Sequence, residues 1–221
     1  MREPIRWKWL GLCAYERSLV LQAAAWEARR AGGSDVCLAL EHPPTITLGR
    51  RVTAADLLTT PTELARRGFT CHSTERGGGA TYHAPGQLVL YPIVNLPERG
   101  MGIRTFVWLL EAIMLEVADA AGVAAHRDAR GRGIWTERGK LGAVGIRVRE
   151  GISTHGIALN VTLDLSGYTL IAPCGVRDLP VTSLRAEGAS VEIVDLLAAA
   201  AQACVRRFGT TLGGHPEEAR L

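Results

Sequence analysis

The stretch ERGGGATYHAPGQLVLYP, residues 75–92, is the part of the sequence around which the rest of the chain is organised. It reads as the end of a strand, a glycine loop and a second strand. Three consecutive glycines let the backbone take positive φ and let a ligand approach without interference from Cβ atoms. Arg76 and His83 flank the loop with polar side chains. Because an ordinary connection needs only about two to five residues and one glycine, we interpret the loop as the wall of a ligand site.

Two familiar phosphate-binding patterns do not fit this loop. A Walker-type loop needs Gly-Lys-Ser or Gly-Lys-Thr, and the only Gly-Lys pair in the chain, Gly139-Lys140, is followed by Leu141. A dinucleotide fingerprint that began at Gly77 would need glycine or alanine at the position of Tyr82 and should open a helix, whereas residues 88–92 are typical of a strand. The loop is therefore neither type of nucleotide site.

The composition is that of an ordinary globular protein, since 47% of the 221 residues are hydrophobic and 21% are charged. We expect one domain over residues 1–221. Residues 1–9 carry scattered charges, and no later apolar run reaches membrane-spanning length, which predicts a cytoplasmic protein that does not bind membranes. The five cysteines are widely spaced without a Cys-x-x-Cys pair, which argues against a disulfide framework and a zinc knuckle.

Hydrophobic periodicity predicts an α+β fold, with a mixed β-sheet and helices packed mainly on one face. Strands are expected at residues 5–12, 36–41 and 68–74, and hairpin-linked strands at 134–136, 140–149 and 155–161. Helices are expected at residues 15–30 and 103–121, and a last one runs to Phe208 from Ser190 as its N-cap.

Cys174 is the cysteine best suited to chemistry, because it lies between Pro173 and Gly175, in an expected turn, whereas Cys37 and Cys204 lie in apolar runs. A loop cysteine before a glycine can present an exposed thiol, and the following N–H can point at a developing oxyanion. A lone loop cysteine is a weak indication by itself.

Two further segments carry glycine breaks in strands. Residues 139–147 form a strand with three glycines, and such bare strands admit a ligand or a close backbone. Lys140 in this strand is either a solvated edge residue or, beside a thiol, a group that favours the thiolate. The strand at 154–161 contains His155-Gly156 and ends near Asn160. Together with the glycine loop, these breaks predict a shared groove.

Net charge is only +3, which does not indicate general nucleic-acid binding. The window from Arg127 to Arg149, however, holds seven basic residues against two acidic ones, Asp128 and Glu137. This charge is either ordinary solvated loop charge or a landing surface for an acidic partner.

The motifs at residues 76–87, 139–147, 154–161, 173–175 and 181–184 follow one another as in the lipoyl(octanoyl) transferases, a family related to biotin- and lipoate-protein ligases. The sequence resembles that family over most of its length. One departure is Ala84 after His83, where the family usually has glycine; it restricts the backbone but removes no reactive group.

The resemblance implies a biotin/lipoate-protein ligase-like catalytic core without a cofactor. It implies transfer of an octanoyl or lipoyl group from acyl carrier protein to a lysine of lipoyl domains, in 2-oxoacid dehydrogenase complexes and the glycine cleavage H protein, as the first step of endogenous protein lipoylation. Nucleic acid has no part in this reaction.

The resemblance also implies roles for individual residues. Cys174 would attack the carrier thioester and hold the acyl chain, and Lys140 would be its acid/base partner. No metal site is implied. The acyl groove would be lined by Arg76, Gly77, Gly78, Gly79, Ala80, Thr81, Tyr82, His83, Ala143, Val144, Gly145, Gly156, Ile157 and Ala158.

Three other functions stay open. An ATP-dependent lipoate or biotin ligase should carry a basic adenylate-binding glycine motif and, in many lipoate ligases, an extra carboxy-terminal domain, whereas only residues 209–221 follow the last expected helix. A non-catalytic module that binds acyl carrier protein would need no thiol at Cys174. A zinc hydrolase built from His83, His155 and Cys174 lacks a His-x-x-x-His motif or paired cysteines.

Overall fold

A large seven-stranded sheet forms the centre of the computed structural model, which describes residues 3–173, 176 and 179–209. Its strands stand in the order β1 (Arg6–Leu12), β2 (Val36–Glu41), β6 (Gln87–Ile93), β10 (Ile152–Asn160), β9 (Gly139–Arg149), β8 (Gly131–Thr136) and β7 (His126–Asp128). The β1–β2 pair is parallel and the other neighbours are antiparallel. The predicted mixed sheet is therefore confirmed.

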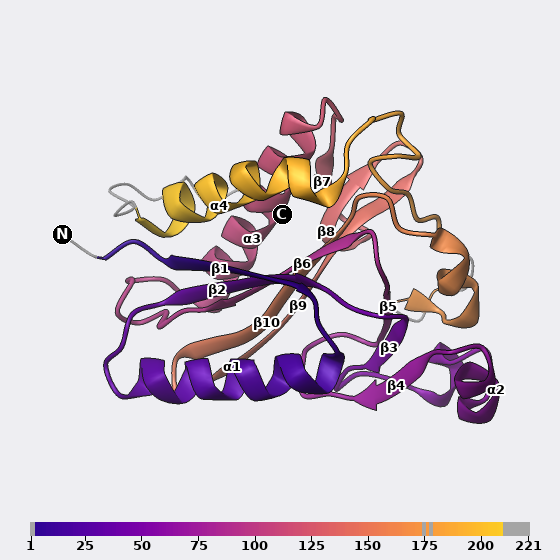
Figure 1. Cartoon of the computed structure of the whole chain (residues 1–221), viewed down its shortest axis with the longest axis horizontal. Helices are drawn as coiled ribbons and strands as arrows, with labels where there is room; N and C mark the ends of the chain where they lie inside the picture. Colours follow the sequence, from indigo (N-terminus) through magenta and orange to yellow (C-terminus); the bar gives the residue numbers. More distant parts are fainter. Residues whose placement is uncertain (1–2, 174–175, 177–178, 210–221) are drawn as a thin grey trace.

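Helices cover both faces of this sheet (Figure 1). Helices α3 (Ile103–Ala120) and α4 (Ile193–Gly209) share one apolar cluster with the sheet, and α1 (Tyr15–Arg30) packs on the opposite cluster. Strand alternation supplies both clusters: Cys37, Ala39, Leu88 and Leu90 face α3 and α4, while Leu38, Leu40, Val89 and Tyr91 face α1. The α+β class with helices mainly on one face is confirmed. Helix α4 begins at Ile193, so Ser190 is not its N-cap.

A second, smaller sheet lies beside the large one, next to the start of α1 (Figure 1). It consists of β4 (Thr70–Ser73), β3 (Thr45–Leu48) and β5 (Ala80–His83), in that order. The short helix α2 (Pro61–Arg66) and the 3₁₀ turns η1 (Ala54–Asp56) and η2 (Leu165–Leu170) complete this part.

The small sheet corrects one expectation and adds a strand. Strand β3, which was not predicted, begins directly after Pro43 and Pro44. Residues 80–83, assigned to the glycine loop from the sequence, form β5, which leaves residues 77–79 as the loop. These residues form a strand because they pair with β3, where Thr47 stands opposite Thr81. Such pairing is set by tertiary packing and cannot be predicted from the local sequence.

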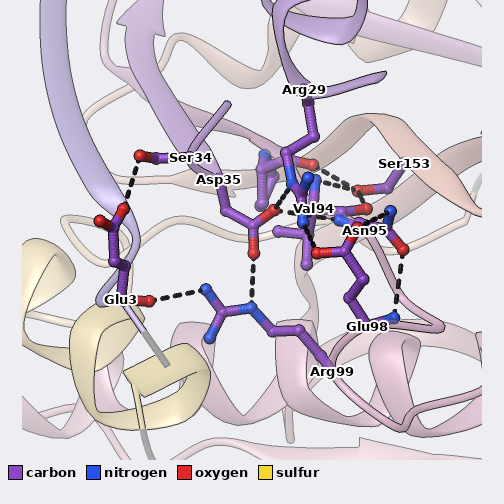
Figure 2. A network of polar contacts seen from close by, with 10 residues as sticks. Glu3, Arg29, Ser34, Asp35, Val94, Asn95, Glu98, Arg99 and Ser153 are labelled. Atoms are coloured by element: carbon purple, nitrogen blue, oxygen red, sulfur yellow. Dashed lines mark hydrogen bonds and ion pairs between the residues drawn. The ribbon is translucent and has the colours of Figure 1, made fainter. Parts of the chain in front are cut away.

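A buried ion network ties α1 to the sheet at the end away from the small sheet (Figure 2). Asp35, just before β2, accepts hydrogen bonds from the Nε atoms of Arg29 and Arg99, both at 2.5 Å, and from the backbone N–H of Asn95 at 3.1 Å. Glu98 pairs with Arg29 as well. Since Asp35 is 5% exposed, its charge is balanced within the protein.

In the described part of the chain, no helix is long and apolar enough to cross a membrane.

Candidate active site

Arg76 organises the glycine loop from inside. Its side chain is buried, and its Nη2 atom donates to the carbonyl oxygens of Thr47 at 2.6 Å and Gly79 at 2.9 Å. Its Nη1 atom donates to the Gly77 carbonyl at 3.0 Å, and its Nε atom donates to the Thr47 hydroxyl at 3.0 Å. One guanidinium, which stays charged at any ordinary pH, thus fixes both ends of the loop on strand β3.

The backbone after β3 holds the same loop from outside. The N–H groups of Gly49, Arg50 and Arg51 donate to the carbonyl oxygens of Gly79, Arg76 and Gly78, at 3.0 to 3.1 Å. A Cβ on Gly49 would overlap the Gly78 carbonyl, and Gly78 itself has a φ of +93°. The glycines therefore serve close backbone packing in a fixed loop.

The loop meets the large sheet at strand β9. The Gly77 N–H donates to the carbonyl of Ile146 at 2.9 Å. A Cβ on Gly145 would lie 3.3 Å from both Arg76 Cδ and the Gly77 carbonyl. The structure thus brings Arg76, Gly77 and Gly145 together, and the bare position in β9 receives the arginine side chain.

The other residues expected to line a groove lie on different surfaces. Gly156 pairs with Gly145, and a Cβ there would overlap the Leu90 carbonyl of β6. Ala158, opposite Ala143, belongs to the cluster on the α1 face, whereas Ile157 and Val144 pack in the cluster of α3 and α4. In β5, Ala80 and Tyr82 pack in a third cluster with Leu163 and Ile171, and Thr81 is half-buried. Which of these residues contact an acyl chain stays a prediction.

His83 starts a chain of hydrogen bonds that ends beside Lys140. The ring Nδ1 of His83 lies 2.6 Å from Gln87 Oε1, so we assign the proton to Nδ1. Gln87 Nε2 donates to Asn160 Oδ1 at 2.9 Å, and Asn160 Nδ2 donates to the Thr182 carbonyl at 2.9 Å. Burial, with His42 nearby, lowers the pKa of His83 well below its usual value, so the ring is neutral.

Lys140 is buried, which excludes the solvated edge position considered from the sequence. Its backbone N–H donates to the Pro180 carbonyl at 2.8 Å, and the Thr182 N–H donates to the Lys140 carbonyl at 3.0 Å. The ammonium lies 5.2 Å from the ring centre of Trp135, on the neighbouring strand β8. Residues 180–182 therefore cover Lys140 and fix its strand.

Cys174 lies outside the described residues, together with Gly175. The described residues on both sides of it are tied to the site. Ala172 donates its N–H to the carbonyl of Asp56 at 2.9 Å, and Val181 forms a parallel bridge with Lys140. Ala172, before this stretch, is therefore held against η1, and Val181, after it, lies along Lys140.

Sequence reasoning missed a buried cluster of imidazoles and phenols beside His83. The His42 ring lies 5.5 Å from the His83 ring, its Nε2 is 2.8 Å from the Tyr91 hydroxyl, and its Nδ1 is 2.7 Å from the Cys13 carbonyl. Burial lowers the pKa of His42 to about 4, and burial with Arg76 nearby lowers that of His155 to about 4. The position of His42 at the end of an apolar strand was the available signal.

Thr47 and Gln87 were also missed as parts of the site. Both side chains are buried, and they connect Arg76 and His83 to the rest of the site. Gln87 belongs to the quoted stretch, but it was not singled out. Nothing in the local pattern of residues 45–48 marks Thr47.

Within the described ranges, no three His, Cys, Asp or Glu side chains are placed to hold a metal ion.

The basic window is divided by the fold. Arg127, Arg130 and Arg147 form ion pairs with Glu111, Asp128 and Glu75. At the far end of β9, the Arg149 guanidinium lies 3.6 Å from the centre of the Trp26 ring of α1. In the β7–β8 part, Arg130 stacks at 4.3 Å on Trp135, the residue that also contacts Lys140. Arg130 and Lys140 therefore share one aromatic ring, whereas Arg149 contacts a different one.

Comparisons with known proteins identify the family. Residues 14–205 match the family described as "Lipoyl protein ligase A/B catalytic domain". A mitochondrial octanoyltransferase of Arabidopsis thaliana is 44% identical over 183 residues, which cover 82% of this chain and 77% of the relative. Because that relative is named mitochondrial, the cytoplasmic location expected from the sequence stays a prediction.

Solved structures agree on the fold. Lipoate-protein ligase A bound with ATP has a TM-score of 0.71 at 17% identity, covering 95% of this chain and 86% of that one. Biotin protein ligase from Aquifex aeolicus, in complex with biotin and ATP, has a TM-score of 0.53 at 11% identity, covering 92% and 70%. The chain therefore belongs to the octanoyltransferase family indicated by its motifs, and it has the catalytic fold of the lipoate- and biotin-protein ligases.

Proposed function

We propose that octanoyl transfer from acyl carrier protein to a lysine of a lipoyl domain runs through a thioester on Cys174, with Lys140 as the proton donor and acceptor. The observation that carries this proposal is the position of Lys140. The Lys140 side chain is buried, and its backbone is hydrogen-bonded to Pro180 and Thr182. Both of these residues follow Cys174 closely in the sequence. The family of the chain supplies the reaction class.

The first half-reaction exchanges one thioester for another. The Cys174 thiolate attacks the carbonyl carbon of the octanoyl thioester, a new C–S bond forms, and the bond to the carrier's pantetheine sulfur breaks. The Lys140 ammonium gives its proton to the departing sulfur and becomes a neutral amine. Because the two thioesters have nearly the same energy, the step needs a thiolate and a placed proton more than it needs activation.

The second half-reaction forms the amide. The nitrogen of the acceptor lysine, arriving as a neutral amine, attacks the thioester carbon of the acyl enzyme, and the sulfur of Cys174 leaves as a thiolate. Lys140 takes the proton from the attacking nitrogen and returns to the ammonium form. A buried site around Lys140 also limits the access of water, which would otherwise hydrolyse the thioester.

We propose two classes of protein partner from this chemistry. The donor is octanoyl-acyl carrier protein, and the acceptors are lipoyl domains of 2-oxoacid dehydrogenase complexes and the glycine cleavage H protein. A lipoyl group on the carrier would react in the same way.

The test is intact mass spectrometry after incubation with octanoyl-acyl carrier protein and no acceptor. We expect one octanoyl group to replace one hydrogen, and peptide mapping to place it on Cys174. Adding a lipoyl domain should discharge the adduct without ATP. Free octanoate with ATP should give neither adduct nor product, and product from that mixture would favour a ligase instead.

Cys174→Ser should retain the fold and lose transfer, because a serine hydroxyl is a far poorer nucleophile at neutral pH. Cys204→Ser is the matched control. Its thiol is buried 4.0 Å from the Cys37 sulfur, so the exchange should lower the free energy of unfolding while turnover per folded molecule stays normal. Wild-type turnover in Cys174→Ser would overturn the acyl-enzyme route.

A further inference from the structure

One continuous segment, residues 49–58, touches both the glycine loop and the chain that leads to Cys174. Its first residues hold the loop through the backbone hydrogen bonds described above. Its last residues pair with the stretch before Cys174, since the Leu58 N–H donates to the Leu170 carbonyl at 2.9 Å and Leu57 forms an antiparallel bridge with Ile171. This segment therefore connects two parts of the site that lie far apart in the sequence.

Asp56 lies where the two sets of contacts meet. Its backbone carbonyl accepts the hydrogen bond from Ala172, two positions before Cys174. Asp56 is only 3% exposed, and Oδ1 of its carboxylate accepts a hydrogen bond from the Thr53 hydroxyl at 2.9 Å. The other oxygen, Oδ2, lies against the glycine loop, because a Cβ on Gly79 would be 2.5 Å from it.

We propose that Asp56 is a positioning residue for octanoyl transfer. Its carboxylate packs η1 against Gly79, and its backbone carbonyl holds Ala172, two positions before Cys174 in the sequence. This inference rests on the proposed role of Cys174.

Gly79→Ala tests the contact directly. Gly79 does not have a positive φ, so an alanine backbone is permitted there. The atoms that an added Cβ would meet are Oδ2 and Cγ of Asp56, at 2.5 and 3.6 Å. The methyl group must therefore push Asp56 away and take Ala172 with it. Since a displacement near 1 Å can cost about 100-fold in rate, we expect kcat to fall about 10- to 100-fold, with a small change in KM for octanoyl-acyl carrier protein.

Removing the carboxylate should remove the cost of the methyl group. Asp56→Ala should itself lower kcat, because η1 loses its contact with the loop. In that background, Gly79→Ala should cost less than about threefold, because the side chain that it struck is gone. The rate of Cys174 alkylation by iodoacetamide, measured on all four proteins, should show the same non-additive pattern.

Two control variants separate this coupling from general damage. Gly78→Ala is strained by its φ of +93°, whatever residue stands at position 56, so it should cost the same in the wild-type protein and in the Asp56→Ala variant. Asp164→Asn alters an exposed carboxylate that caps η2 through the Ser166 N–H, and it should leave kcat unchanged. Thermal unfolding of each variant reports the change in stability.

An equal loss of kcat from Gly79→Ala in both backgrounds would overturn the proposal. A coupling that appears in the unfolding temperature but not in kcat or alkylation would overturn it as well, because Asp56 would then be structural only. A failure of the proposed function has a different signature: Cys174→Ser would turn over normally, and kcat would still respond to the pair of substitutions at positions 56 and 79.

Discussion

The guanidinium of Arg76 donates hydrogen bonds to both the hydroxyl and the carbonyl oxygen of Thr47, with Nη2 at 2.8 and 2.6 Å from them. A buried arginine keeps its charge, so its donors need acceptors inside the protein. Thr47 supplies two of these acceptors, and Gly77 and Gly79 supply the others that we describe. The glycine loop is thereby built onto strand β3.

Thr47→Val should destabilise the protein through this pair. Valine has nearly the same shape but removes the hydroxyl that accepts from Arg76 Nε and Nη2. We expect the free energy of unfolding to fall by about 1 to 3 kcal/mol, because a buried charged donor loses a partner. Urea unfolding measures this change. Thr169→Val makes the same chemical change at an exposed position and should cost less than about 0.5 kcal/mol. Equal costs would contradict the structural role of Thr47.

Periodicity predicted most of the large sheet and the three long helices because those elements bury one face each. The apolar spacing from Ile103 gave α3 almost to the residue. Two of the expected hairpin strands are joined by a tight turn at Glu150-Gly151, in which both residues have positive φ. The small sheet was largely missed, because its strands have only four residues each and their partners are set by tertiary packing.

The sequence indicated which residues belong to the candidate site, but not to which face of its strand each side chain points. Neighbouring residues of a strand point to opposite faces, so Val144 and Ile157 face α3 and α4 while their neighbours Gly145 and Ala158 face the other side. Contiguous runs of groove residues could not show this. The burial of Lys140 was also out of reach, because it depends on pairing with residues 180–182, which lie about forty positions away.

The division of the basic window gives a test for carrier docking. Arg132 is exposed on β8, the strand that also carries Trp135, whose ring contacts the Lys140 ammonium. We expect Arg132→Glu to raise KM for octanoyl-acyl carrier protein several-fold at low salt with little change in kcat, because it repels an acidic carrier near the site. The effect should shrink at high ionic strength.

Arg149→Glu is the matched control, with the same change in net charge. Arg149 is exposed at the far end of β9, where it stacks on Trp26. Its KM should stay near the wild-type value. If both variants raised KM equally, the effect would come from net charge, and if neither did, these arginines would be ordinary solvated charge.

The buried histidines predict a loss of stability in mild acid. The pKa of His155 is about 4 in the folded protein because of burial, against 6.5 for the free side chain. Between these values the unfolded state binds the proton and the folded state does not, so stability is present above pH 6.5 and falls as pH drops toward 4. The slope from one such group is about 1.4 kcal/mol per pH unit, and His42 adds a second.

Urea unfolding between pH 7 and pH 4.5 measures that slope. His155→Asn should reduce it by about 1.4 kcal/mol per pH unit, and asparagine tolerates the φ of +57° at this position. His126→Asn, at a side chain that is 45% exposed on β7, is the matched control for the substitution itself. A slope that is the same in His155→Asn as in the wild type would mean that His155 titrates normally in the folded protein.

Lys140 has two proposed tasks, and two substitutions separate them. Lys140→Met keeps an unbranched side chain but removes the charge, so the pKa of the Cys174 thiol should rise, and both acylation and transfer should slow. Lys140→Arg keeps the charge and the thiolate but cannot pass a proton near neutral pH, because a guanidinium does not deprotonate there.

The measurements are the rate of alkylation by iodoacetamide against pH and single-turnover transfer. Lys140→Arg should alkylate like the wild type and still fail in transfer, whereas Lys140→Met should be altered in both. Since Lys140 is buried beside Trp135, thermal unfolding must show that each variant is folded at the assay temperature. An unshifted alkylation profile with normal turnover in Lys140→Met would remove Lys140 from the mechanism.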